Sequence, residues 1–294
     1  MRVLILGGAG MLGHKLLETF YRNGTNVSCT LRGGISDSPL DRIDLFRKVP
    51  VHEHVDALSH HTLRQKLEEI RPDVIVNCIG IIKQRDQAKL ALESISVNSL
   101  LPHLLAEWAK DWNGRVIHFS TDCVFSGRRG RYTVKDRSDA EDLYGQTKFL
   151  GEVQSENGLT LRTSIIGREL TQFASLVEWF LAQEGNTIRG FTRASYSGMT
   201  TTTMADLVHT ILDRPELITG LQQVVSDPIS KYDLLMLLRE AYGLDVQIEA
   251  DDSFFCDRSM VGSGFTESLD FTVPPWRDQI CRMSADPTPY EAWR

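Results

Sequence analysis

The sequence predicts an α/β fold in which a doubly wound parallel sheet is followed by a smaller C-terminal region. Three observations lead to this prediction. Short apolar strand patterns alternate with amphipathic helix patterns, a glycine-rich turn joins the first strand to the first helix, and the alternation loosens after about Gly167. We therefore expect the sheet domain over residues 1–165 and a second region mainly over residues 166–294.

The first elements follow from an apolar run and a helix-ending pair. A strand is expected at 2–6, where residues 3–6 are a short continuous apolar run, typical of a fully buried strand. The helix expected at 11–21 begins after the glycines and ends at Asn23-Gly24, a pair that favours the left-handed backbone found at helix C-termini. Residues 26–31 then form a second strand.

Prolines flank the helices that are expected in the next segment, residues 40–70. A short amphipathic helix is expected at 40–49 and a longer helix at 62–70. Pro72 stops the longer helix, because a proline disfavours the helical conformation of the residue before it. Residues 73–77, with Val74-Ile75-Val76 at their centre, form the next strand.

Two further strands and two helices complete the first domain. Residues 93–112 form a long helix, in which Pro102 marks a kink or a restart. The strands are expected at 115–120 and 159–163, with a helix at 144–156 between them. Alternation of this kind indicates right-handed crossovers and a parallel sheet.

The C-terminal region shows helix patterns with few strands. Helices are expected at 172–183, 203–213 and 231–242. Residues 223–225 are expected to form a strand. The chain is predicted to return to the sheet near this strand, within residues 204–226, so the boundary between the regions is not a single cut.

Composition narrows the class of protein. The 294 residues can hold one large domain or two smaller ones, and a net charge of −7 argues against a general nucleic-acid binder. Five scattered cysteines without a Cys-x-x-Cys pair suit a reducing cytosol better than a disulfide framework. No stretch is long and apolar enough for a membrane span, and the first apolar run is too short for a signal peptide. These features predict a cytoplasmic protein that binds neither nucleic acid nor membrane.

Two other patterns are set aside. The histidines within residues 52–54 and 60–61 lack the ligand spacing of a closed metal site, so no metal is predicted. The basic run at 128–131 follows the strand at 115–120 and is interpreted as a solvated surface loop. Neither pattern contributes to the predicted chemistry.

The glycine turn predicts a dinucleotide site. Gly7, Gly10 and Gly13 follow a strand and open a helix, the context in which backbone N–H groups and the positive helix end can hold a pyrophosphate. A tight turn without a ligand is the alternative. The second strand ends at Leu31-Arg32 without an acidic residue, and a guanidinium suits a 2′-phosphate. The cofactor prediction is therefore NADPH, with NADH as the alternative.

A Tyr-x-x-x-Lys pair predicts proton chemistry. Tyr144 and Lys148 lie four residues apart and share one face of a helix, so the ammonium can act on the phenol. A phenol near an ammonium can give a proton to a carbonyl oxygen at neutral pH. Ser120, Thr121 and Asp122 end a strand, and the carboxyl ends of parallel strands face the ligand crevice. A reductase is the reaction class that these residues favour.

At this point the chain resembles a known superfamily. The residues that carry the resemblance, besides the glycines and the Tyr144–Lys148 pair, are Val97-Asn98, the run 120–127, Gly151-Glu152 and the run 161–164. Together they resemble the extended short-chain dehydrogenase/reductase superfamily and, within it, the dTDP-4-dehydrorhamnose reductase family of sugar-nucleotide reductases. The resemblance is strong through Ser164 and loose beyond.

The resemblance implies a Rossmann-type domain over 1–165 and a substrate-binding region mainly over 166–294. It implies that Tyr144 protonates the nascent alkoxide, that Lys148 lowers the pKa of Tyr144 and binds the nicotinamide ribose, and that Thr121 polarises the substrate carbonyl. The residues implied in cofactor binding are Gly7, Gly10, Met11, Leu12, Gly13, Arg32, Asp56, Ala57, Asn77, Cys78, Ile79, Gly80, Asn98, Ser120, Tyr144, Lys148 and Thr163. The residues implied in substrate binding are Asp122, Cys123, Val124, Arg193 and Arg258.

Many of these residues also have a purely structural interpretation. Thr121 and Asp122 can cap a turn. Asn77 and Asn98 can be buried hydrogen-bonding residues. Arg32 can be a solvated loop charge, and the same interpretation applies to the two arginines on the substrate side.

Two departures from the family pattern leave the sugar open. Cys123 stands where an aromatic residue is common, and Ile165-Ile166 stand where an aromatic residue often follows the Leu-Arg-Thr-Ser run. Both positions are expected near the substrate or the nicotinamide. The nucleotide base, the product stereochemistry and the oligomeric state also stay open, with a homodimer as the candidate assembly.

The activity that the resemblance implies is the NADPH-dependent reduction of a 4-keto-6-deoxy sugar nucleotide, for the supply of cell-surface polysaccharide precursors. One rival is a sugar-nucleotide epimerase or dehydratase on the same fold, for which Asp122 offers only one carboxylate. Another rival is a dinucleotide-binding regulatory subunit without turnover. Intact Thr121, Tyr144 and Lys148 argue against the regulatory reading.

Overall fold

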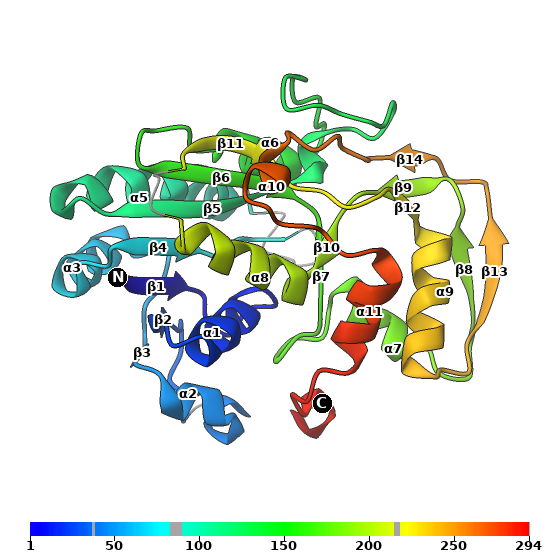
Figure 1. The fold of residues 1–294 in the computed structure, drawn as a ribbon, viewed down its shortest axis with the longest axis horizontal. Coiled ribbons are helices and arrows are strands. Elements are labelled where there is room, and N and C mark those ends of the chain that lie inside the picture. Colours follow the sequence, from blue (N-terminus) through cyan, green and yellow to red (C-terminus); the bar gives the residue numbers. More distant parts are fainter. Residues whose placement is uncertain (37–38, 83–89, 215–217, 294) are drawn as a thin grey trace.

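A seven-stranded parallel sheet is the framework of the protein in the computed structural model, which describes residues 1–36, 39–82, 90–214 and 218–293. Its strands, in spatial order, are β11 (Gly220–Gln223), β6 (Gly158–Thr163), β5 (Arg115–Thr121), β4 (Val74–Asn77), β1 (Arg2–Leu6), β2 (Asn26–Thr30) and β3 (Val51–His52). Figure 1 shows this sheet face-on, with its strands one above another and α1 and α8 in front of them. The α/β fold class predicted from the sequence is confirmed.

The strand order creates a crevice at the carboxyl edge of the sheet. The chain runs outward from β1 to β2 and β3 on one side, and from β4 to β5 and β6 on the other. Leu4 of β1 pairs with Ser28 of β2 and with Ile75 of β4, so the order reverses between β1 and β4. Ligands of doubly wound sheets bind in the crevice at such a reversal.

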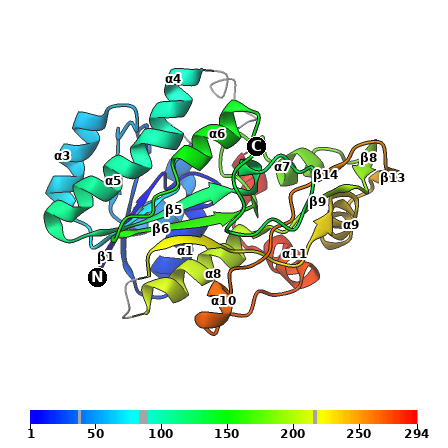
Figure 2. The ribbon, with the colours of Figure 1, turned by 90° about the horizontal axis from the view of Figure 1, so that it is seen from above.

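Helices cover both faces of the sheet. Figure 2 shows α3 (His60–Ile70), α4 (Ala91–Ser94), α5 (Leu101–Ala109) and α6 (Leu143–Leu150) on one side of the strands. The other side carries α1 (Gly13–Arg22) and α8 (Thr201–Leu212). The strands are therefore buried on both faces, which explains why they are continuous apolar runs in the sequence.

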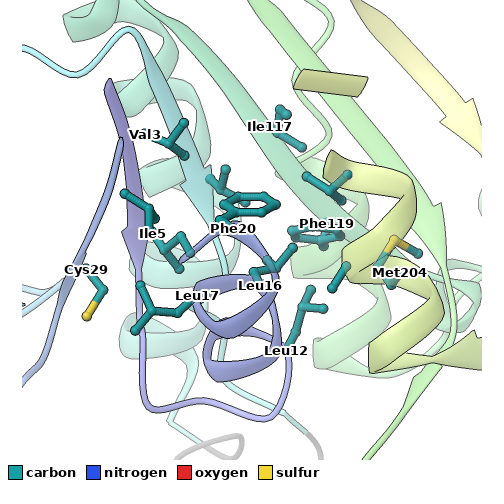
Figure 3. Close-up of a cluster of buried hydrophobic side chains, with 14 of the residues drawn as sticks. Val3, Ile5, Leu12, Leu16, Leu17, Phe20, Cys29, Ile117, Phe119 and Met204 are labelled. Atoms are coloured by element: carbon teal, nitrogen blue, oxygen red, sulfur yellow. The ribbon is translucent and has the colours of Figure 1, made fainter. Parts of the chain in front are cut away.

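The larger core lies under α1 and α8. Leu16 and Phe20 of α1 are fully buried against Ile5 and Ile117 of the sheet, with Met204 of α8 beside them (Figure 3). Burial of each such side chain contributes roughly 1.5–3 kcal/mol. This packing holds the first turn of α1, and hence the glycine turn before it, against the carboxyl edge of the sheet.

A second region lies beyond the sheet, at the right of Figure 1. Its helices are α7 (Leu176–Leu181), α9 (Lys231–Tyr242) and α11 (Trp276–Ser284). The short α10 (Phe265–Ser268) lies at the top centre of Figure 1 beside the sheet, and its Phe265 belongs to the larger core. Its short strands are β7 (Ile165–Ile166), β8 (Thr187–Phe191), β9 (Ala194–Tyr196), β10 (Met199–Thr200), β12 (Ile229–Ser230), β13 (Gln247–Asp251) and β14 (Cys256–Asp257). Most of these strands lack a sequence pattern long enough to predict.

Several elements differ from their predicted bounds. Residues 40–49 form a 3₁₀ turn at Pro39–Arg42 and the short α2 (Asp44–Lys48) in place of one helix. The strand predicted at 223–225 is β11, which pairs with β6 and ends at Gln223. The helix predicted at 172–183 begins only at Leu176, because Gln172 and Phe173 have positive φ angles that no right-handed helix accepts.

The helix predicted at 93–112 is interrupted. A π-helical segment, Ile95–Leu100, separates α4 from α5, and a 3₁₀ turn, Lys110–Trp112, follows. Pro102 stands in the first turn of α5, where a missing N–H is tolerated, so its interpretation as a restart is confirmed. Helix α6 also stops at Leu150 instead of continuing to 156, because the chain turns at Gly151 to bring Glu152 inward.

Candidate active site

Two adjoining pockets occupy the carboxyl edge of the sheet. The first has a volume of about 240 Å³ and the second about 580 Å³. Gly10 of the glycine turn and the segment 78–80 after β4 line both, so the two pockets form one continuous cleft. The cleft crosses the strand-order reversal between β1 and β4.

Close backbone packing shapes the glycine turn. Gly7 has a φ of +83°, and Gly10 N–H donates to the Gly7 carbonyl at 3.0 Å. A Cβ on Gly13 would lie 2.1 Å from the Gly7 oxygen, so this glycine lets α1 start directly beneath the turn. Gly7 and Gly10 line the cleft, together with Met11 and Leu12 at the start of the helix. Gly13 itself lies outside both linings.

The first pocket contains the residues expected at the adenosine end of a dinucleotide. Arg32, Asp56 and Ala57 line it, and Arg32 is exposed. The Asp56 carboxylate accepts the N–H of Leu58 at 3.0 Å, which orders the turn after β3. Strand β2 ends at Thr30 without a carboxylate, although Asp56 and Glu93 line the same pocket as Arg32.

The second pocket brings together the three residues predicted to be catalytic. Thr121, Tyr144 and Lys148 all line it, from the end of β5 and from α6. Thr121 accepts the N–H of Cys123 at 3.1 Å and its hydroxyl donates to Asp122 at 3.1 Å. Thr121 therefore caps the 3₁₀ turn at Asp122–Val124 and lines the second pocket at the same time.

Tyr144 carries its proton in this environment. Burial raises the pKa of Tyr144 above its ordinary value, and Cys123 and Asp122 add to this rise, whereas a hydrogen bond with Thr121 lowers it. The Asp142 carboxylate caps α6 by accepting the N–H of Gly145 at 2.8 Å. This cap fixes the first turn of the helix that presents the phenol to the pocket.

Lys148 is held against the end of β5. Its Nζ donates to the Phe119 carbonyl at 2.6 Å and lies 3.4 Å from His118 Nε2. Burial lowers the pKa of Lys148 to about 8, and Glu152 opposes this shift. Lys148 is therefore still mainly protonated at pH 7, but it releases its proton more readily than a solvated lysine does.

The segment after β4 forms the wall between the two pockets. Asn77 accepts the N–H of Ile79 at 3.1 Å and contacts His118 Nδ1 at 3.2 Å. Asn98 lies outside both linings: its amide donates to the Ile81 carbonyl at 3.0 Å, and its oxygen accepts the Ile81 N–H at 2.9 Å. Asn98 therefore holds the loop at Ile81, and Ile81 lines the first pocket. Cys78, Ile79, Gly80, Ser120 and Thr163 line the cleft as expected.

The predicted substrate residues divide into two groups. Asp122, Cys123 and Arg258 line the second pocket. Val124 is fully buried and packs with Phe125, outside the pocket lining. Arg193 is also outside that lining, with its guanidinium 5.2 Å from the centre of the Phe255 ring.

The sequence reasoning missed a cationic and aromatic side of the second pocket. Lys231 begins α9 and places its Nζ 3.9 Å from the centre of the Tyr196 ring, and both residues line the pocket. Phe191 and Phe254 line the same side. Lys231 follows Ser230, which caps α9, but nothing in this local pattern indicates that the helix begins at the pocket.

In the part of the chain that the structure describes, no group of three or more His, Cys, Asp or Glu side chains is arranged to hold a metal ion. None of the described helices has the length and apolar character needed to cross a membrane.

Comparison with known proteins identifies relatives of the chain. It is 31% identical over 169 residues to a dTDP-4-dehydrorhamnose reductase of Aggregatibacter actinomycetemcomitans, a match covering 55% of this chain and 51% of the relative. It is 28% identical over 155 residues to methionine adenosyltransferase 2 subunit beta of Bos taurus, covering 51% of this chain and 41% of the relative. The chain spans about half the length of the curated relatives it matches.

The fold and the family are shared more widely than these segments. The structure of dTDP-4-dehydrorhamnose reductase from Bacillus anthracis, in complex with NADP, superposes with a TM-score of 0.77 at 18% identity, covering 96% of this chain and 98% of that one. This likeness concerns the fold alone. The family model described as the RmlD substrate binding domain matches residues 1–220. The chain therefore belongs to the RmlD substrate binding domain family, in agreement with the resemblance carried by its motifs.

Proposed function

We propose that the protein is an NADPH-dependent reductase of a 4-keto-6-deoxy sugar nucleotide, of the dTDP-4-dehydrorhamnose type, that supplies precursors of cell-surface polysaccharide. The observation that carries the proposal is the convergence of Thr121, Tyr144 and Lys148 on one pocket of about 580 Å³. That pocket continues directly into the cleft beneath the glycine turn. The names of the relatives support the same substrate class.

The cleft fits a dinucleotide. The glycine turn leaves no room for side chains at two positions. A Cβ on Gly13 would collide with the Gly7 carbonyl, and Gly7 has a positive φ. Backbone N–H groups at the start of α1 and the positive end of that helix suit the pyrophosphate. Arg32 beside the first pocket suits a 2′-phosphate, which favours NADPH over the alternative NADH. When bound, the reduced dinucleotide supplies the hydride for the keto carbon.

The side chains of the second pocket supply the proton and hold the carbonyl. Tyr144 is protonated because burial raises the pKa of the phenol, so it can donate to the developing alkoxide. Thr121 is adjacent and already hydrogen-bonded to Tyr144, which suits it to bind the same oxygen. Lys148 is anchored on Phe119 and is proposed to hold the nicotinamide ribose and to favour proton transfer from the phenol. Charge stabilisation at the alkoxide would provide much of the acceleration.

Charged groups on the far side of the second pocket suit the nucleotide sugar. Arg258 and Lys231 are proposed to bind anionic oxygens, and Asp122 a sugar hydroxyl. The two substrate residues outside the pocket, Val124 and Arg193, are proposed to act only by packing. We also propose the division into a dinucleotide domain over 1–165, with the sheet completed by β11, and a substrate region mainly over 166–294.

An epimerase or dehydratase is the principal alternative. A dehydratase requires an acid and a base beside the hydroxyl that leaves. Asp122 and Glu169 line the second pocket, but the Glu169 carboxylate accepts the N–H groups of Ala174 at 2.6 Å and Ser175 at 3.0 Å. These hydrogen bonds favour a structural role for Glu169 and leave one carboxylate for chemistry. A regulatory subunit without turnover is the other alternative, because one of the relatives is by name a subunit.

A homodimer and a cytoplasmic location complete the proposal. The apolar side chains Leu92, Ile95, Leu100, Phe149 and Leu150 are exposed on α4, the π-helical segment and α6. These elements are joined, since the Ser99 hydroxyl donates to the Thr147 carbonyl at 2.8 Å. A joined apolar surface of this kind suits a second copy of the chain. The five free thiols are consistent with a reducing compartment.

The test is a coupled measurement of oxidation and product. Purified protein is mixed with enzymatically prepared dTDP-4-keto-6-deoxy sugar and with NADPH or NADH, and absorbance is followed at about 340 nm. We expect stoichiometric oxidation, faster with NADPH, and at least a roughly hundredfold loss of kcat for Tyr144→Phe because the general acid is removed. Product formed without net NADPH oxidation would establish the epimerase or dehydratase. Tight NADPH binding without any turnover would support the regulatory subunit.

A further inference from the structure

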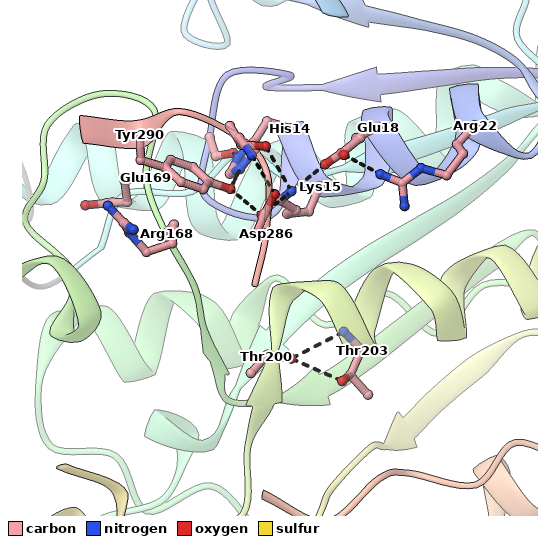
Figure 4. Close-up of polar contacts among 12 residues, drawn as sticks. His14, Lys15, Glu18, Arg22, Arg168, Glu169, Thr200, Thr203, Asp286 and Tyr290 are labelled. Atoms are coloured by element: carbon pink, nitrogen blue, oxygen red, sulfur yellow. Dashed lines mark hydrogen bonds and ion pairs between the residues drawn. The ribbon is translucent and has the colours of Figure 1, made fainter. Parts of the chain in front are cut away.

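The C-terminal segment 286–293 lies against the start of α1, far from its place in the sequence (Figure 4). Tyr290 is almost completely buried there, and its hydroxyl is 2.9 Å from His14 Nε2. The other ring nitrogen, His14 Nδ1, is 2.9 Å from the Gly10 carbonyl. Two hydrogen bonds therefore connect the C-terminal segment to the glycine turn through one buried imidazole.

The direction of these hydrogen bonds follows from the chemistry of the groups. The Gly10 carbonyl can only accept, so Nδ1 carries the proton. Burial, followed by the charge of Lys15, lowers the pKa of His14 to about 3, so the ring is neutral at pH 7 and Nε2 is an acceptor. The Tyr290 hydroxyl has one proton and two acceptors at 2.9 Å, His14 Nε2 and the Asp286 carboxylate, so it donates to one of them at a time.

The carbonyl held by His14 belongs to a peptide that faces the cleft. The Gly10 oxygen also accepts the backbone N–H of His14 at 3.1 Å, so its direction is fixed twice. In a trans peptide the C=O and the following N–H point in opposite directions. Fixing the Gly10 carbonyl therefore fixes the Met11 N–H on the opposite side, and Gly10 and Met11 both line the cleft.

The same segment also contacts a second part of the chain that leads to the cleft. Arg168 donates to Glu291 at 2.6 Å, and its guanidinium lies 4.5 Å from the centre of the Tyr290 ring. Arg168 also donates to the buried Glu178 at 2.7 Å. The chain that leaves Arg168 reaches Thr171, which lines the first pocket.

Buried charge makes the attachment to α1 specific. Lys15 is almost fully buried and forms ion pairs with Asp286 and Glu18. Removing one partner of a buried ion pair leaves an uncompensated charge, so this pair strongly disfavours other positions of the segment. Tyr290, Asp286 and Glu291 thus attach one short segment both to the start of α1 and to Arg168.

We propose that residues 286–293 are a C-terminal clamp that orients the glycine turn for the dinucleotide, with His14 and Tyr290 as positioning residues. The clamp contributes no atom to the reaction. It sets the direction of backbone N–H groups at the start of α1. It also sets the distance between the glycine turn and the segment that begins at Arg168. The inference rests on the proposed function, because the ligand it concerns is NADPH.

The test compares NADPH affinity with the stability of the free protein. The variants are Tyr290→Phe, His14→Leu and His14→Asn, and the matched control is Tyr132→Phe. Tyr132 is a buried tyrosine whose hydroxyl accepts the Arg129 N–H at 3.3 Å, away from the cleft. The dissociation constant of NADPH is measured by nicotinamide fluorescence and the Tm without ligand by calorimetry.

We expect Tyr290→Phe and His14→Leu to weaken NADPH binding by roughly three- to tenfold, the equivalent of one net hydrogen bond. His14→Asn should recover part of the affinity, because its amide can donate to the Gly10 carbonyl. Tyr132→Phe should lower the Tm and leave the dissociation constant unchanged. Equal NADPH affinity in Tyr290→Phe, His14→Leu and the control would overturn the clamp while leaving the reductase intact. If the wild-type protein binds neither NADPH nor NADH, the proposed function and the clamp are both rejected.

Discussion

At the scale of single residues, the second pocket takes Tyr144 and Lys148 from helix α6 and Lys231 from helix α9. Tyr144 and Lys148 share a helix face, so a four-residue spacing was enough to expect them in one pocket. Lys231 lines the same pocket from a helix that begins more than eighty residues later in the chain. Its position depends on how the C-terminal region packs, which no local pattern contains.

The titration of Lys148 gives a pH-dependent prediction for the free protein. The pKa of Lys148 is lowered to about 8, chiefly by burial, whereas in an unfolded chain it is about 10.4. Between these values the unfolded chain binds the proton and the folded chain does not, so stability from this group rises with pH. Lys148→Met should remove this rise, which is on the order of 3 kcal/mol over the full window.

Urea unfolding of wild type and Lys148→Met at pH 7.5 and pH 10 measures the difference. Other groups titrate in both proteins, so the informative quantity is the change in the gap between their free energies of unfolding. The gap should move in favour of the wild type as the pH rises. A gap that is independent of pH would show that Lys148 does not titrate in this window.

At the scale of elements, helices and central strands could be predicted because their apolar periodicity reflects burial. The places where prediction failed are places where a tertiary contact overrides the local pattern. Helix α6 ends at Leu150 because Gly151 packs directly on the Asn98 carbonyl of the π-helical segment. The π-helical segment was itself unpredictable, although Pro102 marked where regular helix resumes.

Gly151→Ala tests the contact between α6 and the π-helical segment. A Cβ at this position would lie 1.9 Å from the Asn98 oxygen, a backbone atom that cannot swing aside. We expect a loss of roughly 1–3 kcal/mol in the free energy of unfolding, measured by urea denaturation. Gly33→Ala is the control, because no atom of the described residues lies within 4 Å of its added Cβ. Equal midpoints for both variants would contradict the packing.

A buried ion pair joins the turn after α6 to the sheet. Arg162 of β6 donates to Glu152 at 2.6 and 2.8 Å, and it donates to Gln223 of β11 at 3.0 Å. Both charged side chains are only 2% exposed. Glu152→Gln should cost roughly 3–5 kcal/mol, because it leaves a buried guanidinium without its counter-charge.

The exposed pair Arg128–Glu141 offers the matched control for this substitution. Its side chains are 73% and 70% exposed, so Glu141→Gln should change stability by at most about 1 kcal/mol. Chemical unfolding of both variants gives the comparison. Similar losses of unfolding free energy from the two substitutions would mean that the buried Arg162–Glu152 pair stabilises the fold no more than an exposed pair does.

At the scale of the whole molecule, the sheet order decides where the functional residues meet. The reversal between β1 and β4 places the glycine turn beside the ends of β4 and β5. The C-terminal region then covers this edge and adds its own pocket-lining residues, including Tyr196 and Arg258. An apolar surface on α4, the π-helical segment and α6 stays exposed, because no element among the described residues covers it.

Leu150→Glu tests the proposed homodimer. Leu150 is 61% exposed at the end of α6, and a buried carboxylate at a two-fold interface would meet its own copy. Sedimentation velocity should show a dimer for the wild type and a monomer for this variant. Tyr21→Glu, at an exposed position on α1 across the sheet, should remain dimeric. A monomeric wild type at micromolar concentrations would overturn the homodimer.

The sequence by itself determined the parallel sheet, the glycine turn and the pairing of Tyr144 with Lys148, because each follows from burial or backbone geometry over a few neighbouring residues. Only the tertiary structure decided that Asn98 acts through a loop, that Val124 and Arg193 lie outside the pocket, and that Lys231 lines it. It also decided that Tyr290 contacts His14, which in turn contacts Gly10 of the glycine turn. These contacts join segments far apart in the chain, and their geometry arises from packing that periodicity and spacing do not encode.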